Sequence, residues 1–501
     1  MKAIKHAVLI FCMMIPCGMP AQTDPKATVE AFKTVIKKYI PRRMDNLAME
    51  IQKNHSKNPD VIYGLAEAFY RNSGVHDSVY SGKYIDNVLK IAPGYSKAYS
   101  LKAEILLYYG DTLAATKWYE KGIAANPKTP RCYLDYARLL CASDVERTKE
   151  VMRSLKKNVP DYPVNRDMAR LFDNLATKRI NTADNLYYAL ENFKKANPDS
   201  LTDYDWILYA NYYLGLKDYD NVVSVCKQGL ERFPRRRDLN RFAFYANYNM
   251  QKWEDAVYYA EELLHNSDTV IPRAVDLLYC ANSYKELKNY QKALQVYGSL
   301  NGMEGLTDSQ KRDIYSDMAE CYAETGAYDE AEKYFLSDVQ TRRSGGKSAF
   351  APLYYMAMMY GKQAETLEGE AKIAACRKAD KLYAEASREN DDRIEYAVRD
   401  RYRLNVYQLN DDYVKGKSVP VAMQLIKLFE AKGDKSVTNN TYRVHVYQYM
   451  AQIYLGYYQT DIKTNVPKAK YYLNKILEYE PEHEGATKAL AALKSGSKGR
   501  R

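Results

Sequence analysis

Histidine and cysteine are the side chains of this sequence that could bind a metal ion or supply a base or a nucleophile. Apart from His6, the histidines are scattered singly along the chain: His55, His76, His265, His445 and His483. None lies in an H-E-x-x-H stretch, the spacing that places two imidazoles on one helix face to bind zinc. No G-x-S-x-G, P-loop or glycine-rich dinucleotide turn is present either. The sequence therefore predicts a protein that is not an enzyme and that needs no metal or cofactor.

The cysteines show no metal-binding or redox spacing. Six of them follow the first twenty residues: Cys132, Cys141, Cys226, Cys280, Cys321 and Cys376. No two form a C-x-x-C pair, and a chain of 501 residues can bury a large core without disulfides. We expect these cysteines to be small buried side chains at helix contacts.

Composition excludes several classes of protein. The chain is 46% hydrophobic and 27% charged, which argues against a disordered chain and against a polytopic membrane protein. Its net charge of +11 is spread along the chain, with one local run at 235–237 and four cations in the last eight residues. Solvated helix faces account for such a distribution better than a phosphate-binding track does, so we expect no nucleic-acid partner.

The first residues predict export. "MKAIKHAVLIFCMMIPCGMPAQ" has a basic start, an apolar run over 7–15 and a small residue at Ala21. These features resemble a bacterial secretory signal peptide over residues 1–21, cleaved before Gln22. The apolar run is too short to span a bilayer, and no later stretch qualifies, so the mature chain has no expected transmembrane segment.

Acylation of Cys17 is the alternative fate of this leader. A lipobox requires a small residue where Pro16 stands and usually has leucine where Met14 stands, so lipidation is not favoured. We expect an exported protein that is periplasmic or peripheral to the outer membrane, where it could join an envelope complex.

A fixed spacing of small and aromatic residues organises the rest of the chain. Counted from Ala319, Tyr322 is three residues on, Gly326 seven, Ala331 twelve and Phe335 sixteen. Similar series start at Ala103, Ala210, Phe244 and Ala281. Each series fits a pair of short helices joined at a turn, with small residues where the two backbones approach closely. Proline stops the second helix in several copies, at Pro127, Pro234 and Pro481.

This spacing resembles that of tetratricopeptide (TPR) repeats, helix hairpins of about 34 residues. The resemblance covers about eleven units over 59–481, preceded by N-terminal helices over 22–58 and followed by a last helix and a basic tail over 482–501. The units at 130–161 and 162–199 have lost most signature residues, one unit carries an insertion over 361–376, and the last is stretched at 457–466. Each hairpin is too small to bury its own apolar face, so it needs neighbours. The implied fold is all-α, a right-handed superhelical solenoid of TPR helix hairpins.

The resemblance also implies a binding site. In TPR proteins the exposed face of each first helix lines a concave groove, and this face maps here to Tyr204, Asn211, Arg241, Tyr245, Asn249, Asn282 and Lys285. Amide, phenol and cationic groups suit hydrogen bonding to an extended peptide and its acidic groups. The set that clamps a chaperone's C-terminal carboxylate is not reproduced, because Tyr245 stands where an asparagine is needed.

Two functions remain open at this point. The first is a non-catalytic scaffold or adaptor in the cell envelope that binds a partner protein or peptide in the groove. The second is a glycan- or nutrient-binding envelope protein whose tyrosine-rich groove stacks on sugar rings; the sequence has 49 tyrosines. The tandem repeats favour the scaffold, and a titration with oligosaccharides would separate the two.

Four tripeptides add a further question. "DSV" at Asp77, "DTL" at Asp111, "DSL" at Asp199 and "DTV" at Asp268 resemble an acceptor for bacterial O-glycosylation. The same residue types also cap helices and turn loops, which is the favoured interpretation.

Overall fold

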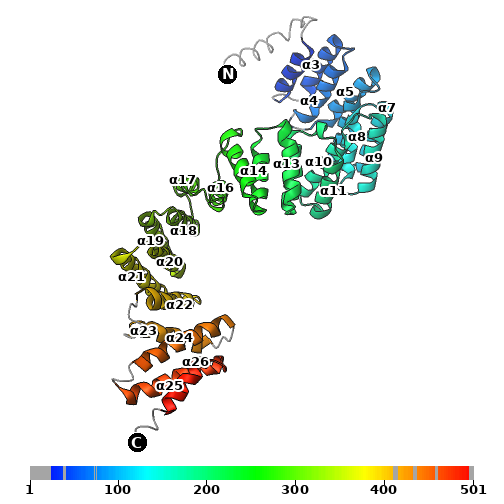
Figure 1. Ribbon diagram of the computed structural model, residues 1–501. Coiled ribbons are helices and arrows are strands. Elements are labelled where there is room, and N and C mark those ends of the chain that lie inside the picture. Colours follow the sequence, from blue (N-terminus) through cyan, green and yellow to red (C-terminus); the bar gives the residue numbers. More distant parts are fainter. Residues whose placement is uncertain are drawn as a thin grey trace. The chain divides into compact units, whose positions relative to one another are not determined.

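The computed structural model describes residues 24–37, 41–72, 74, 76–409, 416–432, 437–456 and 461–495. The predicted signal peptide, including Cys17, and the basic residues after 495 lie outside these ranges. All elements of the described ranges are helices (Figure 1). The chain divides into unit 1, Met1–Phe242, and unit 2, Ala243–Arg501.

Unit 1 is a series of helix pairs. The pairs α4–α5, α6–α7, α8–α9, α10–α11 and α12–α13 each consist of two helices in contact. The helices are α2 (Pro25–Ile36), α3 (Pro41–Asn54), α4 (Pro59–Arg71), α5 (Ser78–Ile91), α6 (Ser96–Tyr108), α7 (Thr112–Ala125), α8 (Pro130–Leu140), α9 (Val145–Asn158), α10 (Val164–Thr177), α11 (Thr182–Lys195), the short 3-10 helix η1 (Pro198–Ser200), α12 (Asp203–Gly215) and α13 (Tyr219–Arg232). The division between the units falls within α14 (Arg237–Asn249).

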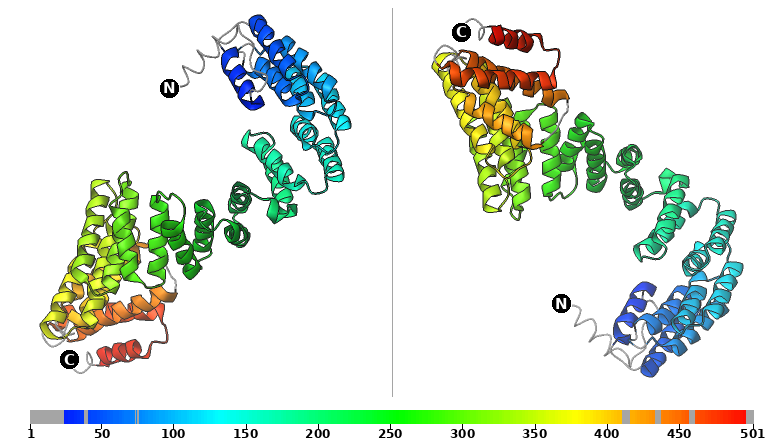
Figure 2. Two further views of the ribbon diagram at one scale, coloured as in Figure 1. Left: turned by 90° about the horizontal axis from the view of Figure 1, so that it is seen from above. Right: turned by 90° about the horizontal axis from the view of Figure 1, so that it is seen from below.

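Unit 2 repeats this arrangement, and several of its helices, such as α18 and α19 with 17 residues each, are longer. It contains α15 (Trp253–Glu261), the π-helical turn η2 (Glu262–Asn266), α16 (Ala274–Glu286), α17 (Tyr290–Asn301), α18 (Asp308–Glu324), α19 (Tyr328–Ser344), α20 (Phe350–Glu365), α21 (Gly369–Ala386), α22 (Ile394–Leu404), the π-helical turn η3 (Asn405–Leu409), α23 (Val419–Lys432), α24 (Val437–Gly456), α25 (Ile462–Tyr479) and α26 (Glu484–Ser495). Consecutive helices from α17 to α22 contact one another, and both views of Figure 2 show them side by side.

The segments that depart from the repeat spacing still form hairpins. Residues 130–161 hold α8 and α9, and residues 162–199 hold α10 and α11. The insertion over 361–376 is absorbed by lengthening both helices of one hairpin: α20 has 16 residues and α21 has 18, against 13 and 14 in α6 and α7. A helix hairpin can thus gain a turn in each arm without losing its partner.

The turn inside each hairpin has one recurring backbone conformation. The residue seven places after the start of each series has a positive φ: +84° at Gly110, +80° at Gly326, and +58° at Lys217, Gln251 and Lys288. In the Lys288 turn the next amide, of Asn289, donates to the carbonyl of Tyr284 at 2.9 Å, which closes the end of the first helix. The glycine turn predicted at Gly326 is confirmed. The sequence did not predict that the same left-handed conformation is held by lysine and glutamine in other repeats.

Lys288→Gly is therefore expected to raise the free energy of unfolding by up to about 1 kcal/mol, because glycine adopts a positive φ without the steric cost of a Cβ. The measurement is urea denaturation followed by circular dichroism. Gln295→Gly, in the exposed interior of α17, is the control and should lower the stability by about 1 kcal/mol. Equal changes in the two variants would contradict the prediction.

The small and aromatic signature residues form the core. Ala281, Ala293, Ala319 and Ala331 are fully buried, as is Tyr297. The six cysteines of the described residues are buried, as the sequence predicted. Burial raises the pKa of the Cys280 thiol to about 12, so this group is a packing side chain rather than a nucleophile at neutral pH.

Asp77 and Asp111 are helix caps. The Asp77 carboxylate accepts from the amides of Val79 and Tyr80, and the Asp111 carboxylate accepts from the amide of Ala114. The capping interpretation of these two tripeptides is therefore confirmed.

Candidate functional site

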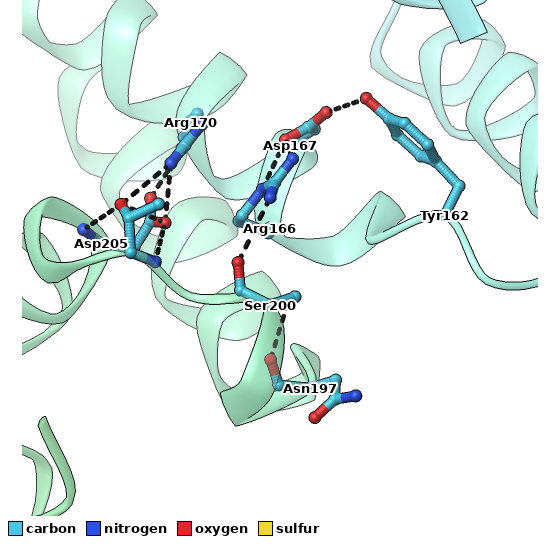
Figure 3. Close-up of polar contacts among 8 residues, drawn as sticks. Tyr162, Arg166, Asp167, Arg170, Asn197, Ser200 and Asp205 are labelled. Atoms are coloured by element: carbon cyan, nitrogen blue, oxygen red, sulfur yellow. Dashed lines mark hydrogen bonds and ion pairs between the residues drawn. The ribbon is translucent and has the colours of Figure 1, made fainter. Parts of the chain in front are cut away.

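Polar contacts join successive hairpins at positions about one repeat apart, and they decide which surface groups are available to a partner. The best-defined example lies in unit 1 (Figure 3). Arg170 on α10 donates from Nε to Oδ1 of Asp205 on α12 at 2.6 Å, and from Nη2 to Oδ2 at 2.7 Å. Asp205 is fully buried and forms a capping box with Thr202 at the start of α12. This arginine therefore holds two hairpins together.

The neighbouring polar side chains in Figure 3, those of Arg166, Asp167 and Tyr162, also have hydrogen-bond partners within the protein. Arg166 donates from Nη1 to the carbonyl of Ser200 at 3.2 Å and from Nε to Asp167 at 2.8 Å. Tyr162 donates its hydroxyl hydrogen to the other oxygen of Asp167. The two arginines thus join helices of neighbouring hairpins.

In unit 1, two of the predicted groove residues are exposed and one is not. Tyr204 and Asn211 are exposed on α12. Arg241 is only 3% exposed, and its Nη1 lies 3.8 Å from Asp238 Oδ1 one turn earlier. The exposed position predicted for Arg241 is therefore not observed, because this side chain is almost completely buried.

In unit 2, Tyr245 and Asn282 make contacts between hairpins. The Tyr245 hydroxyl donates to Asp276 Oδ1 at 2.5 Å. The Asn282 amide donates to the hydroxyl of Tyr248 at 3.0 Å and accepts from that of Tyr297 at 2.5 Å. A residue that bonds to a neighbouring hairpin stabilises the stack of hairpins, so its substitution would change the stability of the fold as well as binding.

Lys285 and Asn249 also contact other groups of the protein. Lys285 Nζ lies 2.6 Å from Asp317 and 2.9 Å from Glu320, both on α18. Burial lowers the pKa of Lys285, but the two carboxylates outweigh burial and raise the pKa above its ordinary value. Burial also raises the pKa of Asp317, against the effect of Lys285. Asn249 is exposed and donates to the carbonyl of Tyr245 at 2.7 Å. The binding role of all these residues stays a prediction.

The structure places two hollows along the first helices of later hairpins in unit 2. The first has a volume of about 550 Å³ and lies between α18, α19 and α20; it is lined by Ser316, Glu320, Ala323, Glu324, Tyr328, Phe335, Tyr355, Met358, Met359 and Lys362. The second has a volume of about 610 Å³ and lies between α20, α21 and α22; it is lined by Met358, Gly361, Lys362, Glu365, Tyr383, Asp400, Arg403, Leu404, Tyr407 and Gln408. We call the two together the α18–α22 groove.

Large apolar side chains lie exposed in the α18–α22 groove. Tyr355 is 50% exposed, Met358 45% and Tyr407 62%. Met358 and Lys362 line both hollows, so α20 forms the ridge between them. Clustered exposed side chains of this kind give little stability to the fold and are typical of binding surfaces.

The groove is lined by charges of both signs. Four carboxylates line it, those of Glu320, Glu324, Glu365 and Asp400, with the two cations of Lys362 and Arg403. Three of the carboxylates lie beside a cation: Glu320 is 2.9 Å from Lys285, Glu324 is 2.8 Å from Lys362, and Asp400 is 3.6 Å from Arg399.

Sequence reasoning missed this groove. The signal was the stretch "LYYMAMMYGK" in α20, where exposed methionine and tyrosine alternate with buried ones. The insertion over 361–376 follows directly and breaks the repeat spacing. The exposed face of α20 could therefore not be mapped by comparison with the other repeats.

Among the described residues, no group of three or more histidine, cysteine, aspartate or glutamate side chains is placed to hold a metal ion. Within the same ranges, no helix combines the length and apolar character needed to cross a bilayer.

No family model matches the chain, and no curated protein matches it. The C-terminal part of a TPR repeat-containing protein from Cytophaga hutchinsonii is 16% identical, with a TM-score of 0.42 over 57% of this chain and 99% of that chain. YrrB, a TPR protein with an unusual peptide-binding site, is 14% identical, with a TM-score of 0.30 over 39% and 91% of the two chains. The TPR domain of P58(IPK) is 15% identical, with a TM-score of 0.22 over 69% and 98%.

The fold follows from the chain's own repeats. Tandem helix hairpins carry buried alanines at the two close approaches, and a left-handed turn residue recurs at one position of the repeat. The chain therefore has the all-α fold of TPR proteins, a solenoid of helix hairpins.

Proposed function

We propose that this chain is a non-catalytic interaction scaffold of the bacterial cell envelope that binds a partner polypeptide in the α18–α22 groove. The observation that carries the proposal is the pair of adjoining hollows with Tyr355, Met358 and Tyr407 exposed in them. Successive first helices are the face on which repeat proteins of this fold offer an extended binding surface.

The envelope location belongs to this proposal. It rests on the leader sequence, in which the basic start, the apolar run over 7–15 and Ala21 have the pattern of a secretory signal peptide. The exported chain is expected to be periplasmic or peripheral to the outer membrane, where a scaffold would gather envelope proteins.

A site-specific crosslink tests the proposal. The photoreactive residue p-benzoylphenylalanine is placed at Tyr355 in living cells and, as the matched control, at Tyr258, which is 57% exposed on α15, the second helix of its hairpin. Irradiation should give one dominant protein adduct from position 355 and none from position 258. Equal adducts from both positions, or none from position 355, would contradict a groove-based partner.

An oligosaccharide titration addresses the competing function. Tyr355 and Tyr407 could also stack on sugar rings. Saccharide binding that is lost in Tyr355→Ala, in a chain that gives no protein adduct, would replace the scaffold with a glycan-binding protein.

A further inference from the structure

We propose that His445 positions the ring of Tyr407 in the α18–α22 groove, and that protonation of this imidazole in mild acid releases the ring and weakens partner binding. This inference rests on the proposed function and adds regulation to the same site. Three features carry it: the anchoring of the turn that bears Tyr407, the contact between the two rings, and the surroundings of the imidazole.

Tyr407 lies on η3, the π-helical turn that follows α22, and it lines the second hollow. Two other residues of this turn bond to α21. Asn405 donates to Asp380 Oδ1 at 2.5 Å, and Cys376 Sγ donates to Gln408 Oε1 at 3.4 Å. π-helical turns are rare and often occur at functional sites. The backbone of η3 is thus held by its own neighbour, whereas the Tyr407 side chain, which is 62% exposed, depends on another contact for its direction.

His445 on α24, in the next hairpin, supplies this contact. The Tyr407 hydroxyl lies 2.6 Å from His445 Nε2, and the two rings are 5.9 Å apart between centroids at an angle of 49°. A phenol donates its hydrogen to the lone pair of a neutral imidazole nitrogen. The His445 ring is fixed in turn by an edge contact with Tyr402, which is only 1% exposed. A buried packing contact therefore sets the position of an exposed ring in the groove.

The surroundings of His445 favour its neutral form. Burial lowers the pKa of this imidazole below its ordinary value near 6.5. The titratable groups on this side of α24 are the phenols of Tyr402 and Tyr407, those of Tyr442 and Tyr449 one turn before and after His445, and the guanidiniums of Arg399 and Arg403. Arg399 is paired with Asp400 at 3.6 Å. A proton on the imidazole thus enters a half-buried site among phenols and cations.

Most titratable groups of the other packed helices face a different side of α24. Tyr447 is two residues after His445, which is about 200° around the helix. The groups that interact with Tyr447 are Glu430 on α23, Arg443 on α24, and Tyr471, Tyr472 and Tyr479 on α25. His483 of α26 is nearer to His445, because it contacts Gln448 one turn further along α24. A positive charge on His483 would oppose a second one on His445, so both effects act in the same direction.

The sign of the pH dependence follows from the lowered pKa. The unfolded chain takes up the proton at a higher pH than the folded chain, so the stabilisation by neutral His445 is complete above about pH 6.5 and falls as the pH decreases. A hydrogen on Nε2 removes the lone pair that accepts from Tyr407. At the midpoint of this protonation half of the molecules hold the ring, so the apparent affinity for the partner is reduced about twofold.

Fluorine NMR of the purified protein tests the positioning step. The residue 3-fluorotyrosine is incorporated at position 407 alone and, as the control, at position 258, since Tyr258 is 57% exposed on α15. Between about pH 8 and pH 5 the resonance at position 407 should show one transition with its midpoint below about 6.5. This transition should disappear in His445→Gln, which cannot titrate, and persist in His483→Gln. Position 258 should show no transition.

Crosslinking measures the effect on the partner. Envelope preparations that contain p-benzoylphenylalanine at position 355 are irradiated at about pH 7.5 and about pH 5, and the adduct should fall about twofold or more at the lower pH. In His445→Gln the yield should be the same at both pH values. Tyr407→Phe keeps the ring without the hydroxyl, so it should give the lower yield at both. Circular dichroism of every variant at both pH values checks that the helices are retained.

The results separate the inference from the proposed function. A transition at position 407 and a pH-dependent adduct, both abolished by His445→Gln, support the inference. A transition that is absent or survives in His445→Gln overturns it. An adduct of equal yield at both pH values also overturns it and leaves the proposed function intact. The absence of an adduct at either pH counts against the proposed function and overturns the inference with it.

Discussion

Asp205→Ala is expected to lower the free energy of unfolding of unit 1 by about 2–3 kcal/mol. The fully buried carboxylate accepts two hydrogen bonds from Arg170 of the preceding hairpin, and it also accepts from the amide and the hydroxyl of Thr202. Its removal deletes the side-chain half of the capping box with Thr202 and takes away the carboxylate that pairs with Arg170. The loss stays below that of a fully buried pair because the Arg170 side chain is partly exposed to water.

Hydrogen exchange measured by mass spectrometry localises this effect. Amides of α10 and α12 should exchange faster in Asp205→Ala, because the contact between these hairpins is weakened. Asp184→Ala is the control: Asp184 also lies in the first turn of a helix, α11, but is exposed, so its loss should cost less than about 1 kcal/mol. An effect of Asp205→Ala as small as that of the control would show that the Arg170–Asp205 contact does not join the hairpins.

Gly122→Ala should destabilise unit 1 by about 1–3 kcal/mol, even though alanine is the better helix former. A Cβ at this position would lie 2.5 Å from Cys132 Sγ and 2.8 Å from the Cβ of Tyr99. The second of these atoms is fixed to the backbone of α6, so the helices themselves must move apart. Gly229 occupies the same place in a later repeat, where a Cβ would lie 2.7 Å from Leu239 Cδ1 and 3.1 Å from Trp206 Cβ.

Gly298→Ala is the matched control for this prediction. It also lies inside a second helix, α17, but a Cβ there would meet no atom within 4 Å. The control should therefore gain about 0.5–1 kcal/mol from helix propensity. The two midpoints of urea denaturation should move in opposite directions. A Gly122→Ala protein as stable as the wild type would mean that the close contact of α6, α7 and α8 is not required.

The sequence by itself determined the local architecture. Small residues at the close approaches, aromatic residues between hairpins and a glycine such as Gly326 at the turn can be read from spacing, because each hairpin repeats the same short-range contacts. This is why the all-α hairpin fold and the burial of the cysteines were predictable. It is also why Asp77 and Asp111 could be recognised as caps.

The tertiary structure decided which polar groups are left for a partner. Arg241, Tyr245, Asn282 and Lys285 have the residue types of a binding face, yet Arg241 is buried and the other three bond to neighbouring hairpins. Whether a lysine faces water or a carboxylate one repeat away depends on how two hairpins pack, and repeat spacing alone does not encode that choice. The α18–α22 groove arises for the same reason: the side chains of α18, α20 and α22 meet only after the lengthened hairpins have packed side by side.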